Sequence, residues 1–324
     1  MKKWGSKILI LNLSVFGFFL VLINYPLQEP GTNKKPVTQK PKYILYYSQF
    51  WSSDNFGHGY GMNPFVANNC SVNNCFITNN RSLLPEIEDF DMIIFYTGRG
   101  EVPKKRSPKQ FYVYFSLEAP PQSGINGYAE RYKSFFNLTM TYRRDSDIFL
   151  PYGELQSGDY VSTIKNKLKE TSSRLTDDRK LVAWVVSHCE TQSKREKYVQ
   201  KMKNWIPIDQ YGKCTAGGDC DNTCYMNLGT KYKFYLSFEN SLCKDYVTEK
   251  LWRILEQDMI PVVLGSANYT DVAPPHSFIN VQDFKSPEEL AKYLLKLEKN
   301  QKVIFLTEGE EISQSPTGVH YVFA

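Results

Sequence analysis

The clearest succession of apolar and polar segments lies between residues 233 and 265. Residues 234–238 form an aromatic-rich run typical of a buried strand. Asp245 suits a helix N-cap, which predicts a helix over residues 246–257. A second apolar strand is expected at residues 260–264. The order of strand, helix and strand predicts a βαβ unit.

The hydrophobic pattern outside this unit predicts an irregular α/β domain first and a Rossmann-like domain second. Helices are expected over residues 193–205 and 287–297, the latter because Ser286 and Glu289 form a capping box around a proline. Strands alternate with helices from residue 181 to residue 297, and such sheets bind ligands at the C-terminal ends of their strands. The other predicted strands cover residues 43–47, 91–96, 111–117, 181–186 and 278–281.

The helix predicted at residues 246–257 has two different faces. One is an apolar stripe suited to packing on a sheet, formed by Val247, Leu251, Ile254 and Leu255. The other is polar and lies near the helix start, formed by Tyr246, Glu249, Lys250 and Arg253. Free N–H groups and a lysine charge attract anions, and a nearby carboxylate accepts sugar hydroxyls, so this face suits a sugar nucleotide. An ordinary solvated Glu/Lys face has the same spacing.

The N-terminus has the pattern of a membrane anchor. Residues 8–23 are predominantly apolar and follow three lysines. A helix over this run is about 24 Å long, and the aromatic residues at its edges, Trp4 and Tyr25, extend it towards the roughly 30 Å of a bilayer core. No small-residue cleavage site follows, which favours a retained signal-anchor over a cleaved signal peptide. The positive-inside rule then predicts a type II protein with a lumenal remainder, and so short an anchor favours early secretory membranes.

The composition indicates the cellular compartment of the protein more than its fold. The 324 residues, 42% of them hydrophobic, suffice for two cored domains, and a net charge of +5 does not indicate a nucleic-acid surface. Seven cysteines fit an oxidising compartment, and the pair Cys220 and Cys224 lacks the second ligand pair of a zinc site. Four glycosylation sequons agree with a lumenal location: Asn69, Asn80, Asn137 and Asn268.

Several long runs carry a specific resemblance. FNLTMTYRRDSDIFLPYG at residues 136–153 and YKFYLSFENSLCKDYVTEKLW at 232–252 closely resemble the α-1,3-fucosyltransferase family of the Golgi. IPVVLG at residues 260–265 and FINVQDFKSPEELAKYL at 278–294 resemble the same family. The similarity extends over residues 70–297.

The resemblance implies an α/β, GT-B-like fold, with two Rossmann-like domains that face a cleft after the N-terminal membrane anchor. It implies inverting transfer of L-fucose from GDP-β-L-fucose, in α-1,3 linkage, to N-acetylglucosamine of an N-glycan or lactosamine-type acceptor. No cofactor is expected to be obligatory, and a divalent cation (Mn²⁺ or Mg²⁺) is expected at most to stimulate. The expected partners are GDP-fucose, the acceptor and a Golgi lipid bilayer crossed by one helix, with a homodimer through the membrane or stem and no nucleic acid.

Six segments are expected along the chain. They are a cytosolic tail and signal-anchor at 1–25, a stem at 26–42, an acceptor-side α/β domain at 43–155, a linker at 156–180, a GDP-fucose-binding domain at 181–300 and an atypical tail at 301–324.

Residue types agree with the roles that the resemblance implies. Inverting transfer needs a base for the acceptor hydroxyl, and Glu118 matches the family's proposed base. The leaving nucleoside diphosphate needs cations, and Arg195 and Lys250 match the family's helix-borne arginine and phosphate-facing lysine. Tyr246 and Glu249 match donor-site residues, and Glu249 is expected to hold ribose or fucose hydroxyls. The expected donor site is completed by Asn240 and Ser187 at strand ends.

The residues also allow other interpretations. Glu118 could be a helix cap, and Arg195 lies in a run typical of a solvated helix face. A retaining glycosidase would need Glu118 and Glu249 about 5–5.5 Å apart and would leave Lys250 without a role. A buried salt-bridge network, rather than a metal site, is expected from Arg143, Arg144, Asp145 and Asp147.

The end of the chain departs from the family pattern. Family members continue after the helix near residue 297 with an aromatic, basic segment and a terminal Cys-x-x-Cys that pairs with two N-terminal cysteines. Cys70 and Cys75 match that N-terminal pair, but this sequence lacks the terminal motif, and a bridge between Cys70 and Cys75 is the other possibility. The alternative function is therefore a truncated, inactive family member that binds GDP-fucose or scaffolds an active partner.

Overall fold

The computed structural model describes residues 40–51, 53–96, 101–124, 130–157, 178–215, 218–273, 277–299 and 319–323. The anchor predicted at residues 8–23 lies outside these ranges, as do most of the linker and most of the tail. Within the described ranges, no helix has both the length and the apolar character needed to cross a membrane.

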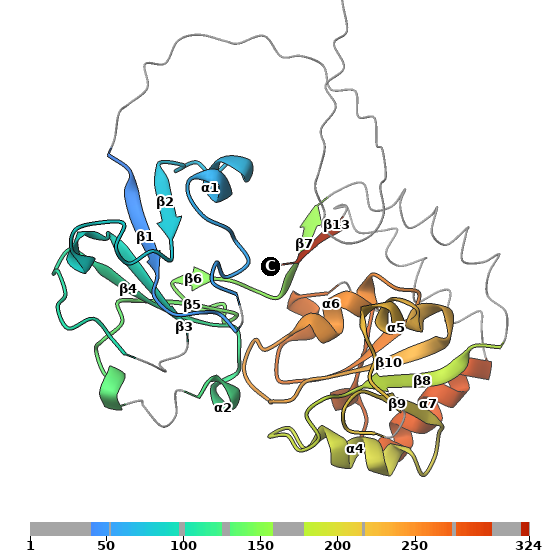
Figure 1. The fold of residues 1–324 in the computed structure, drawn as a ribbon. Helices are drawn as coiled ribbons and strands as arrows, with labels where there is room; N and C mark the ends of the chain where they lie inside the picture. The colour runs from blue at the N-terminus through green and yellow to red at the C-terminus, as the bar shows by residue number, and fades with distance from the viewer. Residues whose placement is uncertain are drawn as a thin grey trace, which may run out of the picture. The chain divides into compact units, whose positions relative to one another are not determined.

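The first half of the described chain forms a six-stranded parallel sheet with the order β2-β1-β3-β4-β5-β6 (Figure 1). Two short helices, α1 (Asn63–Ala67) and α2 (Pro120–Ser123), belong to the same part. The strands are β1 (Lys42–Tyr46), β2 (Cys75–Thr78), β3 (Met92–Tyr96), β4 (Phe111–Ser116), β5 (Leu138–Thr141) and β6 (Ile148–Phe149).

Both faces of this sheet are covered by apolar side chains. Leu45 and Ile93 belong to one buried cluster, whereas their chain neighbours Tyr46 and Ile94 belong to another. Successive strand residues point to opposite faces, so a strand that is buried on both sides reads as a continuous apolar run. This is why β1, β3 and β4 were recognisable from the hydrophobic pattern.

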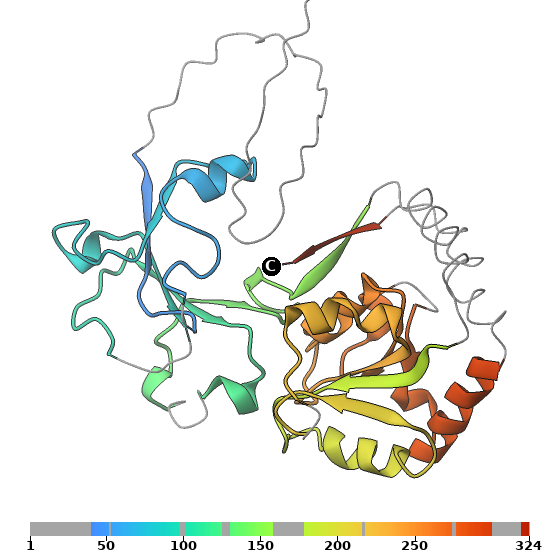
Figure 2. The same ribbon diagram turned by 45° about the vertical axis from the view of Figure 1, so that its right-hand side comes forward.

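The second half forms a five-stranded parallel sheet with the order β12-β11-β10-β8-β9. Helices α4 and α7 cover one face, and α5 and α6 cover the other (Figures 1 and 2). The strands are β8 (Lys180–Val185), β9 (Ile208–Tyr211), β10 (Tyr232–Phe238), β11 (Ile260–Leu264) and β12 (Ile279–Asn280). The helices are α4 (Arg195–Met202), α5 (Asn222–Met226), α6 (Glu249–Leu255) and α7 (Pro287–Lys299).

The central strand β10 is buried at all seven positions. Phe234 and Phe238 pack with α4 and α7 on one face, and Tyr235 packs with Ile254 of α6 on the other. Together the two parallel sheets confirm the predicted α/β architecture. Separately, β7 (Gly153–Ser157) pairs with β13 (Val319–Phe323) as an antiparallel ribbon.

The helix predicted over residues 246–257 is shorter than expected and begins later. It covers Glu249–Leu255, with Thr248 at the N-cap position. Asp245, the predicted cap, has a left-handed backbone with φ of 61° and precedes the helix by four residues. The prediction was wrong because the local sequence pattern does not show that the Glu239 carboxylate holds Thr248.

The predicted buried salt-bridge network is also wrong. Arg143 pairs with Asp145 at 2.6 Å, but both side chains are more than two-fifths exposed. Asp147 accepts hydrogen bonds from the backbone and hydroxyl of Thr139, and Arg144 donates to the carbonyl of Asp271. These residues therefore form exposed turn and surface contacts instead of a buried charge cluster.

Candidate active site

The chain order of the five-stranded sheet reverses between β8 and β10. From β8 the chain first adds β9 on one side, and it later returns to add β10 on the other side. The C-terminal ends of these parallel neighbours share one edge of the sheet, and ligands in open α/β sheets bind at such a reversal. Ser187 and His188 follow β8 at this edge, and Glu239 and Asn240 follow β10.

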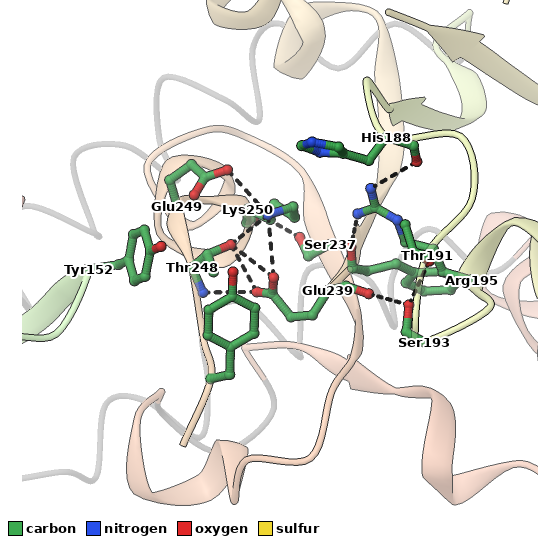
Figure 3. Close-up of polar contacts among 12 residues, drawn as sticks. Tyr152, His188, Thr191, Ser193, Arg195, Ser237, Glu239, Thr248, Glu249 and Lys250 are labelled. Atoms are coloured by element: carbon green, nitrogen blue, oxygen red, sulfur yellow. Dashed lines mark hydrogen bonds and ion pairs between the residues drawn. The ribbon is translucent and has the colours of Figure 1, made fainter. Parts of the chain in front are cut away.

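A buried carboxylate and a lysine form the centre of this edge (Figure 3). Glu239 is only 1% exposed, and its carboxylate accepts hydrogen bonds from the Thr248 backbone N–H at 2.8 Å and hydroxyl at 2.9 Å. The Lys250 ammonium lies 3.3 Å from Glu239 Oε2 and donates to Thr248 Oγ1 at 2.7 Å. Glu249 Oε1 lies 3.3 Å from the same ammonium.

The charges of this group support one another. Burial of Lys250 opposes its charged form, but the carboxylates of Glu239 and Glu249 outweigh that effect and raise the lysine pKa. Burial also opposes the charged form of Glu249, but Lys250 outweighs it and lowers the glutamate pKa. The side chain of Glu249 is 39% exposed, so its carboxylate is accessible to a ligand hydroxyl.

Arg195 is buried, contrary to the solvated helix face that its charged neighbours suggested. It is 2% exposed, and its guanidinium donates to the carbonyl of Phe238 at 2.5 Å and to that of His188 at 3.5 Å. It therefore connects the residues that follow β8 with the end of β10. Its Nε has no hydrogen-bond partner within the described chain.

Two further predicted donor residues lie at the same edge. Asn240 is 6% exposed, and its Oδ1 is buried without a hydrogen-bond partner in the described residues. Ser187 is exposed and precedes Cys189, which is bonded to Cys214 in the segment after β9. This disulfide fastens the segment after β8 to the segment after β9.

Glu118 lies near this group although it belongs to the other sheet. It follows β4, is half-buried, and its Oε2 accepts a hydrogen bond of 3.4 Å from the hydroxyl of Tyr246. The Tyr246 ring is 2% exposed and packs against Ala119 and Tyr142. Burial raises the pKa of Glu118, partly opposed by Lys250, Tyr246 and His188 and assisted by Glu249.

The predicted site residues therefore gather in one place, and the structure adds two that the sequence analysis did not assign. Hydrogen bonds, ion pairs and electrostatic effects join Glu118, Tyr246, Glu249 and Lys250. Glu239 and Thr248 are the additional members. The signal for Glu239 was its position directly after the aromatic-rich run of β10, where the apolar pattern ends.

The sequons and the remaining cysteines can be placed as well. The four predicted glycosylation asparagines, Asn69, Asn80, Asn137 and Asn268, are all exposed. Of the predicted pair, Cys70 and Cys75 are both free thiols, and Cys243 is also free. A second disulfide joins Cys220 and Cys224. In the described ranges, no cluster of three or more His, Cys, Asp or Glu side chains is arranged to hold a metal ion.

Comparison with protein families gives matches over both sheets. Residues 39–153 match the family model described as "Fucosyltransferase, N-terminal". Residues 175–305 match "Glycosyltransferase family 10 (fucosyltransferase) C-term". The two matched ranges contain the whole of the six-stranded and five-stranded sheets.

Curated relatives of the chain are also fucosyltransferases. The chain is 40% identical over 248 residues to alpha-(1,3)-fucosyltransferase C of Drosophila melanogaster, covering 69% of this chain and 57% of the relative. It is 38% identical over 254 residues to 3-galactosyl-N-acetylglucosaminide 4-alpha-L-fucosyltransferase FUT3 of Homo sapiens, covering 73% and 66%. The chain thus spans less than two thirds of the length of either relative.

The fold agrees with a crystal structure of an alpha1,3-fucosyltransferase with GDP-fucose, with a TM-score of 0.56 at 17% identity, covering 86% of this chain and 85% of that one. This likeness supports the GT-B-like fold, and the family matches carry the assignment. The chain belongs to glycosyltransferase family 10, the fucosyltransferases.

Proposed function

We propose that this protein transfers L-fucose from GDP-fucose, with inversion, to the 3-hydroxyl of N-acetylglucosamine in a glycan. The observation that carries the proposal is the hydrogen bond from Tyr246 to Glu118. Glu118 is a carboxylate with a raised pKa, and the charge of Lys250 acts on it. A general base and a cation are the two groups that such a transfer needs, one for the acceptor hydroxyl and one for the leaving diphosphate.

The donor half of the reaction is assigned to the edge of the five-stranded sheet. Lys250 faces the diphosphate and balances the charge that develops as the glycosidic bond breaks. Arg195 adds a second positive charge near the diphosphate and holds the carbonyls of Phe238 and His188. Glu249 and Asn240 Oδ1, which has no hydrogen-bond partner in the described part of the chain, accept hydroxyl or amine donors of the sugar nucleotide.

The acceptor half is assigned to Glu118. Its carboxylate removes the proton from the acceptor hydroxyl as that oxygen attacks the anomeric carbon, and the phosphate oxygen leaves with the bonding electron pair. The bound proton remains on Glu118 until the product departs. The Tyr246 hydroxyl donates to one carboxylate oxygen and orients the carboxylate, and the other oxygen takes the proton in this proposal.

The linkage has to be tested, because the names of the relatives differ. The human relative FUT5 is called a 4-galactosyl-N-acetylglucosaminide 3-alpha-L-fucosyltransferase, at 39% identity over 237 residues, with 70% of this chain and 59% of the relative covered. FUT3 has the galactose and fucose positions exchanged in its name. When galactose occupies O4 of the acceptor N-acetylglucosamine, the 3-hydroxyl is the free one of these two positions. Such an acceptor therefore tests for α-1,3 transfer.

The purified full chain, incubated with GDP-fucose, should therefore fucosylate N-acetyllactosamine, and mass spectrometry with linkage analysis would identify the product. Glu118→Gln should lose at least about a thousandfold in turnover, because it retains the size but not the basicity of the side chain, and should still bind GDP. Activity should persist in a chelator, with added Mn²⁺ only increasing it. Absence of product from a wild-type protein that GDP stabilises would refute the transferase assignment.

We also propose a type II Golgi membrane protein with residues 26–324, the stem included, in the lumen. The lysines before residues 8–23 and the exposure of all four sequon asparagines support this topology. Protease protection in intact microsomes, combined with a glycosidase-sensitive mass shift, would test it. Protease digestion of the folded part without detergent would contradict it.

A further inference from the structure

Glu239 is a buried carboxylate that has no role in the proposed function. It is neither the proposed base nor one of the proposed donor contacts. It follows β10 directly and is 1% exposed. An ionised carboxylate in so dry a position is costly unless both oxygens have partners. Here Oε1 accepts from the Thr248 N–H, and Oε2 lies within 3.3 Å of both the Thr248 hydroxyl and the Lys250 ammonium.

The hydrogen bonds run in one direction. The Lys250 ammonium donates to Thr248 Oγ1 at 2.7 Å, so that hydroxyl has its own proton free for the Glu239 carboxylate. Consistent with this use, Thr248 makes no side-chain cap for α6, although threonine at an N-cap position usually does. Burial raises the pKa of Glu239, opposed by Lys250 and by the two Thr248 donors, which all stabilise the ionised carboxylate. With Lys250 protonated and Glu239 ionised, both carboxylate oxygens have a donor and the two opposite charges are paired.

We propose that Glu239 is a positioning residue, which holds Lys250 charged and pointed towards the donor diphosphate without touching the substrate itself. The part of this role that concerns the donor rests on the proposed function. The part that concerns the charge of Lys250 can be measured without any ligand.

Within the described residues, the titratable groups that act on Lys250 come from several elements and include Tyr235 of β10. Burial disfavours its ammonium, Glu239 and Glu249 stabilise it, and Arg195 opposes it. Glu118 and Lys250 also influence each other across the site. Of the two stabilising carboxylates, Glu249 is 39% exposed, and a bound sugar would compete for it. Glu239 is the partner that cannot be reached by solvent or sugar.

The substitution Glu239→Gln removes the charge and keeps the shape. The Lys250 pKa should then fall, because the buried carboxylate no longer balances the effect of burial on the ammonium. The pH dependence of amine acylation at Lys250, followed by mass spectrometry on the ligand-free protein, measures this directly. A Lys250 titration midpoint that is unchanged in Glu239→Gln would overturn the proposal.

A matched pair elsewhere in the fold provides the control. Lys233 in β10 lies 3.3 Å from Glu298 of α7, with side-chain exposures of 10% and 33%. Glu298→Gln removes a carboxylate at the same distance from a buried lysine, outside the site. It should leave the acylation profile of Lys250 unchanged.

Donor binding is the second measurement. At pH 8, Glu239→Gln should bind GDP about tenfold more weakly than wild type in calorimetry, because a charge-assisted contact to the diphosphate is lost. As pH rises, the GDP affinity of Glu239→Gln should begin to fall at a lower pH than the GDP affinity of wild type. A loss of affinity that is independent of pH, with a lowered Tm, would mean that Glu239 has only a structural role. If wild-type protein does not bind GDP, the proposed function fails while the acylation result still decides the charge of Lys250.

Two further variants keep the question decidable if Glu239→Gln does not fold. Glu239→Asp retains the charge and should restore the Lys250 titration. Thr248→Val removes the bridging hydroxyl and should lower the Lys250 pKa in the same direction but less. In a Lys250→Met background, Glu239→Gln should cause no further loss of GDP affinity, because the effect acts through Lys250. An equal further loss would contradict the proposal.

Discussion

Glu118 and Lys250 are the two residues whose environments set the proposed chemistry. Burial raises the pKa of the Glu118 carboxyl, and the hydroxyl of Tyr246 lowers it in part. Lys250 keeps a raised pKa in a buried position because two carboxylates face it. The pKa of Glu118 is thus shifted towards neutral pH and that of Lys250 away from it. These directions suit the proposed base and the proposed diphosphate-binding cation.

The pKa of Glu118 predicts a pH dependence. The base form exists above its pKa, so kcat/KM should be constant at higher pH and fall as pH falls through that raised value. Tyr246→Phe removes a contact that lowers the pKa and should move the acidic limb to higher pH. Tyr142→Phe is the control, because this ring packs 4.8 Å from that of Tyr246, and among the described residues the hydroxyl that donates to Glu118 is that of Tyr246. Superimposable profiles for Tyr246→Phe and wild type would contradict the assignment.

Removing Lys250 should be costly for stability. Lys250→Met leaves Glu239 buried without its cation, and loss of one partner of a buried pair costs about 3–5 kcal/mol. Lys233→Met should cost less than half of this, because its partner Glu298 is one third exposed and can be hydrated. Urea unfolding of both variants, followed by circular dichroism, gives the comparison. Equal costs would show that Glu239 does not depend on Lys250.

At the scale of elements, the site depends on where loops leave the sheet. The segments after β8 and β9 are joined by the Cys189–Cys214 disulfide and by the backbone hydrogen bond from Val186 to Tyr211. Helix α6 begins only at Glu249, since Thr248 is engaged by Glu239. The positions of His188, Glu239 and Lys250 are consequently set by contacts between elements.

Gly212 is predicted to be essential for this arrangement of loops. It has φ of +92°, and an added Cβ would lie 2.4 Å from the carbonyl oxygen of Val186. Gly218, with φ of +86° and no atom within 4 Å, would suffer the backbone strain alone. Gly212→Ala should therefore lower the free energy of unfolding by about 1–3 kcal/mol more than Gly218→Ala, because the overlap adds to the strain. Chemical denaturation of both variants checks this, and equal losses would contradict it.

At the scale of the whole molecule, the segment around residues 142–153 contacts the second sheet's loops. The backbone of Arg144 donates to Asp245, and the rings of Tyr152 and Tyr246 lie 6.2 Å apart. Gly153 meets the buried indole of Trp252, where an added Cβ would lie 2.5 Å from a ring carbon. These contacts connect residues about one hundred positions apart in sequence, as the pair Arg144 and Asp245 shows with a separation of 101.

Gly153→Ala should thus destabilise the fold by about 1–3 kcal/mol through overlap with Trp252. Combined with Trp252→Phe, which shortens the ring, its cost should be smaller than when it is introduced alone. Gly61→Ala is the control, since its nearest contact is Phe76 at 3.9 Å, and its cost should simply add to that of Trp252→Phe. Thermal unfolding of the single and double variants measures the coupling, and strict additivity for Gly153 would disprove the contact.

The sequence by itself determined the strands that are buried on both faces, and it indicated the candidate residues of the site. β1, β3, β4, β8, β10 and β11 were predicted to within two residues, because their apolar runs are continuous and local. Helix α7 was predicted at its start, since Ser286 caps the Glu289 N–H as the local signature requires. The short strands β2, β5, β6 and β9 were missed, because short or partly polar strands depend on a neighbour's backbone for pairing.

Only the tertiary structure decided which side chains meet. Glu118 and Tyr246 are 128 residues apart, and no local pattern reports their contact. The burial of Arg195, the later start of α6 and the role of Glu239 each depend on a partner from another element. The apolar pattern of a segment indicates which of its faces is buried away from water. A buried charge, in contrast, is tolerated only where the fold brings its counter-charge and hydrogen-bond donors close to it.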